Sequence, residues 1–178
     1  RQPAQPVAAV NGDFLIIKKG PYQGDPLGLQ LMGGRLVSSA DERATFWLDP
    51  SGQPHIGRVR SESKVVWPDG SSTPILINKP VATNAAVLFT PLLGRSTRAT
   101  NNLELVLEPQ GQGPWLPLQA NQSYLARIGE VRIQGNTPLA PGSMVLSLGP
   151  QLAAQLTPPR GGASLKLVTG FSPALQGV

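Results

Sequence analysis

The chain lacks cysteine altogether and contains a single histidine, His55. Disulfide bonds and thiolate zinc sites are therefore excluded. A histidine-rich metal site or a Ser-His-Asp centre would depend on His55 alone, and this residue stands between Pro54 and Ile56 in an expected hairpin, where we give it no role. The sequence thus indicates neither a metal nor another cofactor.

Charged and aromatic residues are also scarce. Only 14% of the residues are charged, although 15 Lys and Arg against 10 Asp and Glu leave a net charge of +5. This charge favours anionic partners, but the cations are scattered singly or in pairs, and three Trp, two Tyr and four Phe offer few rings for base stacking. We therefore expect no nucleic-acid partner.

Long hydrophobic runs are missing as well. No stretch approaches the ~18 apolar residues of a membrane span, and no apolar segment of a signal peptide follows Arg1, so we expect no membrane span. With 20 Gly and 19 Pro, long helices are not expected either. Hydrophobic residues still make up 40% of the 178 residues, enough for the core of one domain.

Short runs rich in Val, Ile, Leu and Thr, each bounded by Gly, Pro, Asn or Asp, recur along the chain and predict a mainly β (α+β) fold with hairpin-rich mixed or antiparallel sheets. Gly33-Gly34 suits a tight hairpin because both positions tolerate positive φ. Two further hairpins turn at Asp49-Pro50-Ser51-Gly52 and at Pro68-Asp69-Gly70. We expect these three consecutive hairpins to form a meander.

Later runs predict five more strands, and one short segment predicts a helix. Gln151 to Leu156 consists of good helix formers, and Pro158-Pro159 would end the helix. Equal repeated units and a linker long enough to separate domains are both absent. We therefore interpret residues 1–178 as a single β-rich unit, with further strands over Ala85 to Thr90, Leu103 to Leu107, Ser123 to Ile133, Ser143 to Ser147 and Leu165 to Thr169.

An ordered series of short motifs runs from about Ala8 to Pro173. Its pieces, in chain order, are Asn11-Gly12-Asp13-Phe14, Asn78-Lys79-Pro80, Phe89-Thr90-Pro91, Gly94-Arg95-Ser96-Thr97-Arg98, Leu103-Glu104-Leu105-Val106-Leu107 and Gly142-Ser143-Met144-Val145-Leu146-Ser147. This series resembles the amino-terminal half of the phosphodiester glycosidase domain, the family of the lysosomal uncovering enzyme N-acetylglucosamine-1-phosphodiester α-N-acetylglucosaminidase and its bacterial relatives. Each piece is short, and the resemblance depends on their order.

The resemblance implies hydrolysis of a sugar-1-phosphodiester to free sugar and a phosphomonoester. A carbohydrate phosphodiester on a bacterial surface or exopolysaccharide glycan is the implied partner, and an extracytoplasmic location follows from it. The carboxy-terminal half of the family, with an Arg-Thr-Ala segment and an Asn-Leu-Asp-Gly-Gly-Gly-Ser motif, has no counterpart before Val178. We therefore expect that a carboxy-terminal half or a second chain completes the domain, and that this half alone exposes apolar sheet surface.

Two groups of site residues follow from the resemblance. The opening Asn-Gly turn and the Ser-Thr turn belong to one functional region in that family, so we expect them to lie around one concave site. The charge of the substrate suits a cationic side chain of the second turn, although solvation alone also explains exposed arginines. The expected substrate-binding residues are Asn11, Gly12, Arg95, Thr97 and Arg98.

Glycoside cleavage needs an acid and a base or nucleophile. We assign these roles to Asp13, at the end of a strand in the opening motif, and to Glu104, in a strand between Leu103 and Leu105. Because side chains alternate along a strand, Glu104 lies on the face opposite those leucines, and a solvated carboxylate is the alternative interpretation.

The other function left open is a noncatalytic β module that binds polysaccharide or protein. Trp47, Trp67 and Trp115 all lie in or beside expected strands. If they share one exposed sheet face, they form a surface on which sugars stack. If they pack in the core, as large aromatics commonly do, that interpretation loses its support.

Overall fold

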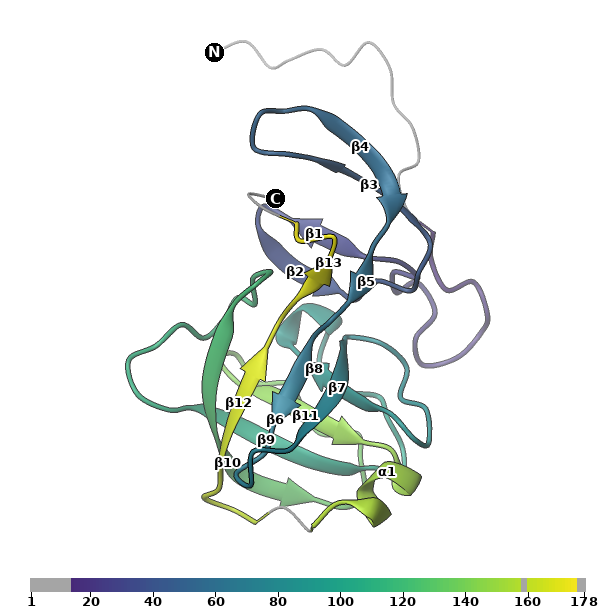
Figure 1. Cartoon of the computed structure of the whole chain (residues 1–178). Helices are drawn as coiled ribbons and strands as arrows, with labels where there is room; N and C mark the ends of the chain where they lie inside the picture. The colour runs from purple at the N-terminus through teal and green to yellow at the C-terminus, as the bar shows by residue number, and fades with distance from the viewer. Residues whose placement is uncertain (1–13, 158–159, 176–178) are drawn as a thin grey trace.

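The computed structural model describes residues 14–157 and 160–175, and within them the chain is built around a closed seven-stranded β-barrel (Figure 1). The strands follow one another around the barrel in the order β10, β12, β6, β7, β8, β11 and β9, and β9 pairs with β10 to close it. The barrel strands are β6 (Lys64–Val66), β7 (Ser72–Ile77), β8 (Ala86–Phe89), β9 (Leu103–Pro109), β10 (Ser123–Arg132), β11 (Met144–Leu148) and β12 (Ser164–Val168).

The barrel sheet is mixed. Its neighbouring strands are antiparallel except for β7 and β8, which run parallel with Ile75 beside Ala86 and Ile77 beside Leu88. Alternate residues of each strand point inward and fill the barrel, as in other small barrels. Leu88, Leu105 and Leu146 are each fully buried in this interior core.

A second, smaller apolar cluster lies on the outer side of the barrel. Val87 and Phe89 of β8 and Val145 of β11 alternate with inward-pointing neighbours, and they pack with Ala99 and Leu139 from loops. Sheet residues of both faces are thus buried at β8, β11 and β9, because segments outside the barrel cover this wall. That covered wall carries the polar residues described below.

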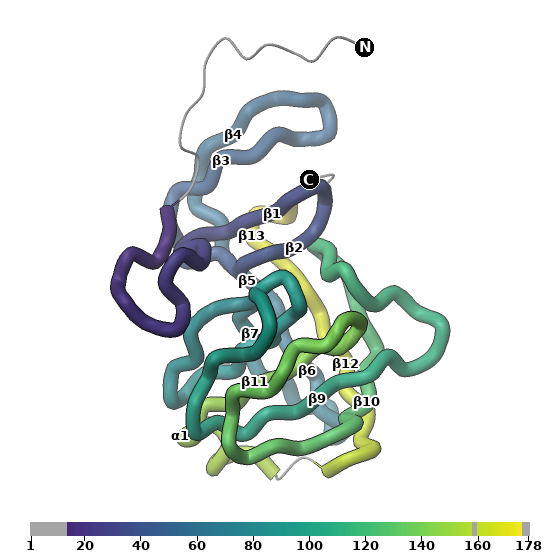
Figure 2. Tube along the Cα trace, turned by 180° about the vertical axis from the view of Figure 1, so that it is seen from behind, coloured from purple at the N-terminus to yellow at the C-terminus, as the bar shows by residue number. Residues whose placement is uncertain are grey.

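The amino-terminal strands form separate two-stranded sheets outside the barrel. β1 (Gln30–Met32) pairs with β2 (Arg35–Ser38), and β3 (Ala44–Leu48) pairs with β4 (Pro54–Arg58). Both hairpins lie at one end of the barrel (Figures 1 and 2). The Gly33-Gly34 turn has positive φ angles of 54° and 76°, as predicted.

The predicted meander is wrong, although all three hairpins exist. β1–β2 and β3–β4 are independent sheets, and only β6–β7 enters the barrel. The chain leaves one sheet for the next through β5 (Arg60–Ser61), which pairs with β13 (Phe171–Ser172) near the end of the described chain. Hairpin signals predict local pairing, but they do not specify which hairpins share a sheet.

The prediction of a mainly β fold with one short helix is confirmed. The helix α1 spans Pro150–Gln155, within one residue of the predicted bounds, and begins with a proline in its first turn. A 3-10 turn, η1, spans Pro91–Leu93. Among the described residues, no helix is long and apolar enough to cross a membrane.

Candidate functional site

Two loop segments cover the outer wall of β9 and β11. Residues 95–101 and 134–139 pair with each other through bridges between Ser96 and Pro138 and between Thr100 and Gly135. A side chain at Gly135 would overlap the carbonyl oxygen of Ala99, with its Cβ only 2.6 Å from that atom. Only glycine fits there, so the two segments approach closely and form a lid on the wall.

Glu104 lies beneath this lid and is fully buried. It points to the outer wall, as strand alternation predicts, but it is not solvated. Its Oε2 accepts a hydrogen bond of 2.9 Å from the backbone N–H of Thr137, whereas its Oε1 has no hydrogen-bond partner among the described residues. A buried carboxylate oxygen without a partner is costly to a fold, so its presence requires a structural or functional explanation.

The threonines beside Glu104 are buried as well. The backbone N–H of Thr97 donates to the carbonyl oxygen of Thr137 over 3.0 Å, and both side chains are almost without exposed surface. Neither hydroxyl has a hydrogen-bond partner within the part of the chain that the structure describes. Glu104, Thr97 and Thr137 therefore form a buried polar cluster with three unsatisfied oxygen atoms.

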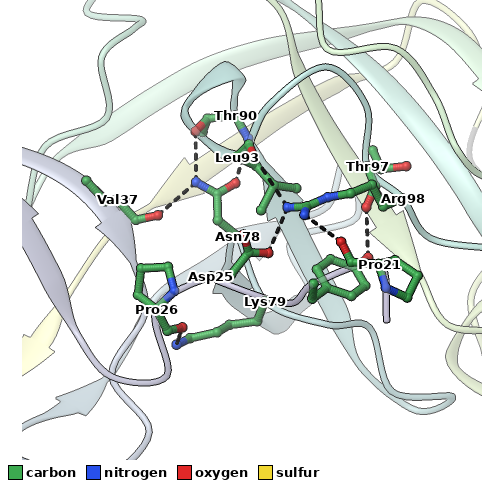
Figure 3. Close-up of polar contacts among 11 residues, drawn as sticks. Pro21, Asp25, Pro26, Val37, Asn78, Lys79, Thr90, Leu93, Thr97 and Arg98 are labelled. Atoms are coloured by element: carbon green, nitrogen blue, oxygen red, sulfur yellow. Dashed lines mark hydrogen bonds and ion pairs between the residues drawn. The ribbon is translucent and has the colours of Figure 1, made fainter. Parts of the chain in front are cut away.

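Arg98 connects this cluster to the amino-terminal loop of residues 14–28. Its guanidinium donates to Asp25 Oδ2 at 2.7 Å, to the carbonyl oxygen of Pro21 at 2.6 Å and to that of Leu93 at 3.3 Å (Figure 3). It also lies over the ring of Tyr22, 4.9 Å from the ring centroid. These directed contacts hold Arg98 in one orientation, because each of them fixes the guanidinium plane.

Burial and neighbouring charges shift the pKa values of two titratable groups at this junction, Tyr22 and Asp25. Burial raises the pKa of Tyr22 to about 12, Glu104 and Asp25 add to the increase, and Arg98 opposes it. The phenol therefore stays protonated and donates to the carbonyl oxygen of Thr97 over 2.7 Å. Burial also raises the pKa of Asp25, whereas the adjacent Arg98 acts to lower it.

Two more side chains attach the amino-terminal region to the barrel. Lys79, just after β7, is buried, and its Nζ donates to the carbonyl oxygens of Pro26, Leu27 and Gly28 over 3.0, 2.6 and 3.2 Å. Asn78 donates through Nδ2 to the carbonyl oxygen of Val37 over 2.8 Å (Figure 3). The loop that follows the opening motif is thus held by barrel side chains.

Three of the seven predicted site residues come together. Thr97, Arg98 and Glu104 meet at the junction between the lid and the amino-terminal loop. Arg95 does not join them: its side chain is exposed, and its carbonyl oxygen accepts from the N–H of Leu139. The remaining predicted residues, Asn11, Gly12 and Asp13, lie outside the described residues.

Sequence reasoning missed four members of this junction. Tyr22 and Asp25 stand in the segment Gly20-Pro21-Tyr22-Gln23-Gly24-Asp25-Pro26, whose glycines and prolines indicate only a turn. Thr137 enters through its backbone N–H, which no side-chain pattern reveals. The sequence did carry a signal for Lys79, because the position directly after an expected apolar strand and before a proline is unusual for a lysine.

The three tryptophans do not share an exposed face. Trp67 belongs to the interior core, and Trp47 and Trp115 pack against that core from different elements. The indole N–H of Trp115 donates to the carbonyl oxygen of Gly142 over 2.6 Å. The expected sugar-stacking surface is therefore not formed by these residues.

A cavity of about 330 Å³ lies elsewhere, beside Trp67 and the carboxyl end of α1. Its wall is mainly apolar and includes Ile128 and Leu165. The carboxylate of Asp69 at its edge is bound by the N–H and hydroxyl of Ser71, and these hydrogen bonds lower its pKa. None of the predicted site residues that the structure describes, Arg95, Thr97, Arg98 and Glu104, lines this cavity. Over the described residues, moreover, His, Asp and Glu nowhere gather in a group of three or more that would suit a metal ion.

Comparison with known proteins identifies the fold but not a family. The sequence matches no protein-family model, and no curated protein matches it either. Among solved structures, the chain is similar to a hypothetical protein from Synechocystis (16% identity, TM-score 0.63) over 92% of this chain and 28% of that one. It is also similar to a protein named "Putative exported protein" from Burkholderia pseudomallei K96243 (15% identity, TM-score 0.65), over 94% of this chain and 38% of that one. The chain thus spans well under half the length of these two proteins.

Proposed function

We propose that the chain is the amino-terminal part of an extracytoplasmic phosphodiester glycosidase that hydrolyses a sugar-1-phosphodiester. The observation that carries the proposal is the clustering of Thr97, Arg98 and Glu104, residues selected through the resemblance. Thr97 and Arg98 contact the loop that directly follows the opening motif, and Glu104 lies beneath the lid. The greater length of two structurally similar proteins, one of them named as exported, supports a larger exported enzyme.

The burial of Glu104 revises its proposed role. With no exposed surface, its carboxylate does not reach a substrate unless the lid moves, and one oxygen is already bound to the N–H of Thr137. Glu104 then acts as a positioning residue that holds the lid through the N–H of Thr137. Asp13 remains the proposed catalytic carboxylate, and the exposed Arg95 is the cation able to contact the phosphodiester.

The test is hydrolysis of a sugar-1-phosphodiester by the protein encoded by the complete gene, with Asp13→Asn, Glu104→Gln and a control, Glu108→Gln. Glu108 lies on the same strand but is exposed, where it pairs with Arg127 at 2.7 Å. We expect Asp13→Asn to lose ~10²-fold or more in kcat and one limb of the pH profile. Glu104→Gln should lose less than ~10-fold and keep the profile, because glutamine still accepts from Thr137.

Each outcome of this test bears on a different part of the proposal. A complete protein that hydrolyses no sugar-1-phosphodiester rejects the function. An Asp13→Asn variant within about twofold of wild type rejects Asp13 as the catalytic carboxylate. A Glu104→Gln variant that folds normally but loses both the rate and a limb of the pH profile returns Glu104 to a catalytic role.

A further inference from the structure

The hairpin β3–β4 carries apolar residues on both of its faces. In the register of the pair, Trp47 lies opposite His55 on one face, whereas Phe46 lies opposite Ile56 and Leu48 opposite Pro54 on the other. Apolar residues on both faces are typical of a strand that is buried on both sides. One of these two faces is nevertheless open in the structure.

The inner face is partly covered, although the His55 side chain stays 43% exposed. Trp47 packs against the interior core and stacks on His55, with ring centroids 5.2 Å apart. His55 is in turn bound by Asp49, whose Oδ2 lies 3.0 Å from the imidazole Nε2. This face attaches the hairpin to the body of the protein.

The outer face is exposed. Phe46, Leu48 and Ile56 keep 63%, 50% and 78% of their surface accessible, and with Pro54 they form one apolar patch. This patch is part of a wider asymmetry, because seven of the eleven large apolar side chains that are exposed in the described chain precede residue 57. A row of adjacent exposed apolar side chains marks an interaction surface.

We propose that the polypeptide continuing after residue 178 docks on this outer patch, an inference that rests on the proposed function in taking the chain as part of a longer protein. The last strand of the described chain, β13, pairs with β5, and β5 follows β4 after Val59 alone. The chain therefore passes the base of the hairpin at Ser172, shortly before its described part ends at Leu175. In the two similar solved structures, 62% and 72% of the length lies outside the match, since the match spans 38% and 28% of them.

A second copy of the chain is the less suitable occupant. Stable complexes between free proteins bury roughly 1,200–2,000 Å² in total, which exceeds what three or four side chains on a two-stranded hairpin provide. A continuation attached close to the patch needs no such area, because its effective concentration is high. The small size of the patch thus favours a tethered partner over a free one.

Because the chain has no cysteine, single cysteines report directly on the patch. Ile56→Cys and Leu48→Cys are placed in the 178-residue chain and in the protein encoded by the complete gene, with any cysteines of the continuation replaced by serine. Leu125→Cys, on barrel strand β10 with 55% of its surface exposed, is the matched control. The rate of modification by a maleimide is measured for each after circular dichroism confirms folding.

We expect the cysteines at positions 56 and 48 to react at least ~10-fold more slowly in the complete protein than in the 178-residue chain, and the cysteine at 125 to react equally in both. Equal rates at 56 and 48 in the two proteins overturn the inference, as does a reading frame that stops at residue 178. Protection already present in the 178-residue chain assigns the patch to a second copy if it grows with concentration, or to the chain's own residues if it does not.

The outcome of this experiment does not depend on whether the protein hydrolyses a sugar phosphodiester. Protection of the patch without sugar-phosphodiester hydrolysis keeps the interface and rejects the glycosidase. Hydrolysis without protection of the patch keeps the glycosidase and rejects the interface.

Discussion

The barrel and the amino-terminal region are held together by different kinds of interaction. Every barrel strand has a hydrogen-bonded neighbour on both sides, and its inward side chains are almost fully buried. β1–β2 and β3–β4, by contrast, are two-stranded sheets, which are marginally stable alone. The β1–β2 hairpin and the loop of residues 14–28 depend on Asn78 and Lys79, just after β7, and on Arg98 of the lid, whereas β3–β4 is attached through Trp47.

This difference means that the stability of the barrel and the position of the amino-terminal loop depend on different residues. The backbone ladder and the interior core stabilise the barrel, and the amino-terminal region adds Leu36 of β2 to that core. A few polar side chains, most of them buried, determine where the loop after Asn11-Gly12-Asp13 lies. Substitutions in these side chains should therefore displace the candidate site while leaving the barrel folded, whereas core substitutions should destabilise the whole protein.

The largest effect is expected for Leu146→Ala. Leu146 is fully buried in the interior core, and its truncation should lower the free energy of unfolding by about 2–5 kcal/mol. Urea denaturation followed by tryptophan fluorescence measures the loss. The matched control, Ile56→Ala on the open hairpin face, should change the free energy of unfolding by less than ~0.5 kcal/mol. Equal losses in the two variants would contradict the distinction between the regions.

A smaller effect than that of Leu146→Ala is expected for Tyr22→Phe, and it should depend on pH. The change removes the hydrogen bond to the carbonyl of Thr97 but keeps the ring stacked near Phe89, so about 1 kcal/mol should be lost at neutral pH. Because the folded pKa of Tyr22 is about 12 against 10.0 ordinarily, the folded state retains a proton that the unfolded state releases between these values. Stability contributed by Tyr22 is therefore lost as pH rises through that window.

Urea denaturation of both proteins at several pH values from about 9 to 12 measures this contribution. The stability of wild type should fall more steeply than that of Tyr22→Phe. Tyr124, whose pKa burial also raises, remains in both proteins and cancels in the comparison. Parallel curves would show that Tyr22 is not buried at the junction.

The sequence predicts these two regions unequally well. The hairpin at Gly33-Gly34, the strand containing Glu104 and the helix after Gly149 were all predicted, because turn chemistry and strand alternation act over a few residues. Closure of the barrel was not predicted, since the parallel pairing of β7 with β8 and the contact of β9 with β10 join segments that no local pattern connects. The prediction of a meander failed for the same reason.

The candidate site was also predicted only in part. Strand alternation correctly placed Glu104 on the face opposite Leu105, but alternation does not reveal whether a loop covers that face. The partners of Arg98 include backbone carbonyl oxygens of Pro21 and Leu93, which every residue possesses. Such contacts are determined by the tertiary fold, so a sequence pattern does not identify them.

The central claim is that barrel side chains hold the amino-terminal loop in place, and amide hydrogen exchange in Lys79→Met tests it most directly. Methionine keeps the length of the buried side chain but removes the three hydrogen bonds to Pro26, Leu27 and Gly28. Lys166→Met, at an exposed position on barrel strand β12, is the control.

The account predicts that the loop amides of Ile16, Gly24 and Leu27, which bond within the loop, exchange at least ~10-fold faster in Lys79→Met than in wild type. The amides of β11 should exchange at unchanged rates, and Lys166→Met should match wild type throughout. Unchanged exchange of the loop amides in Lys79→Met, or an equal acceleration in the loop and in β11, would contradict it.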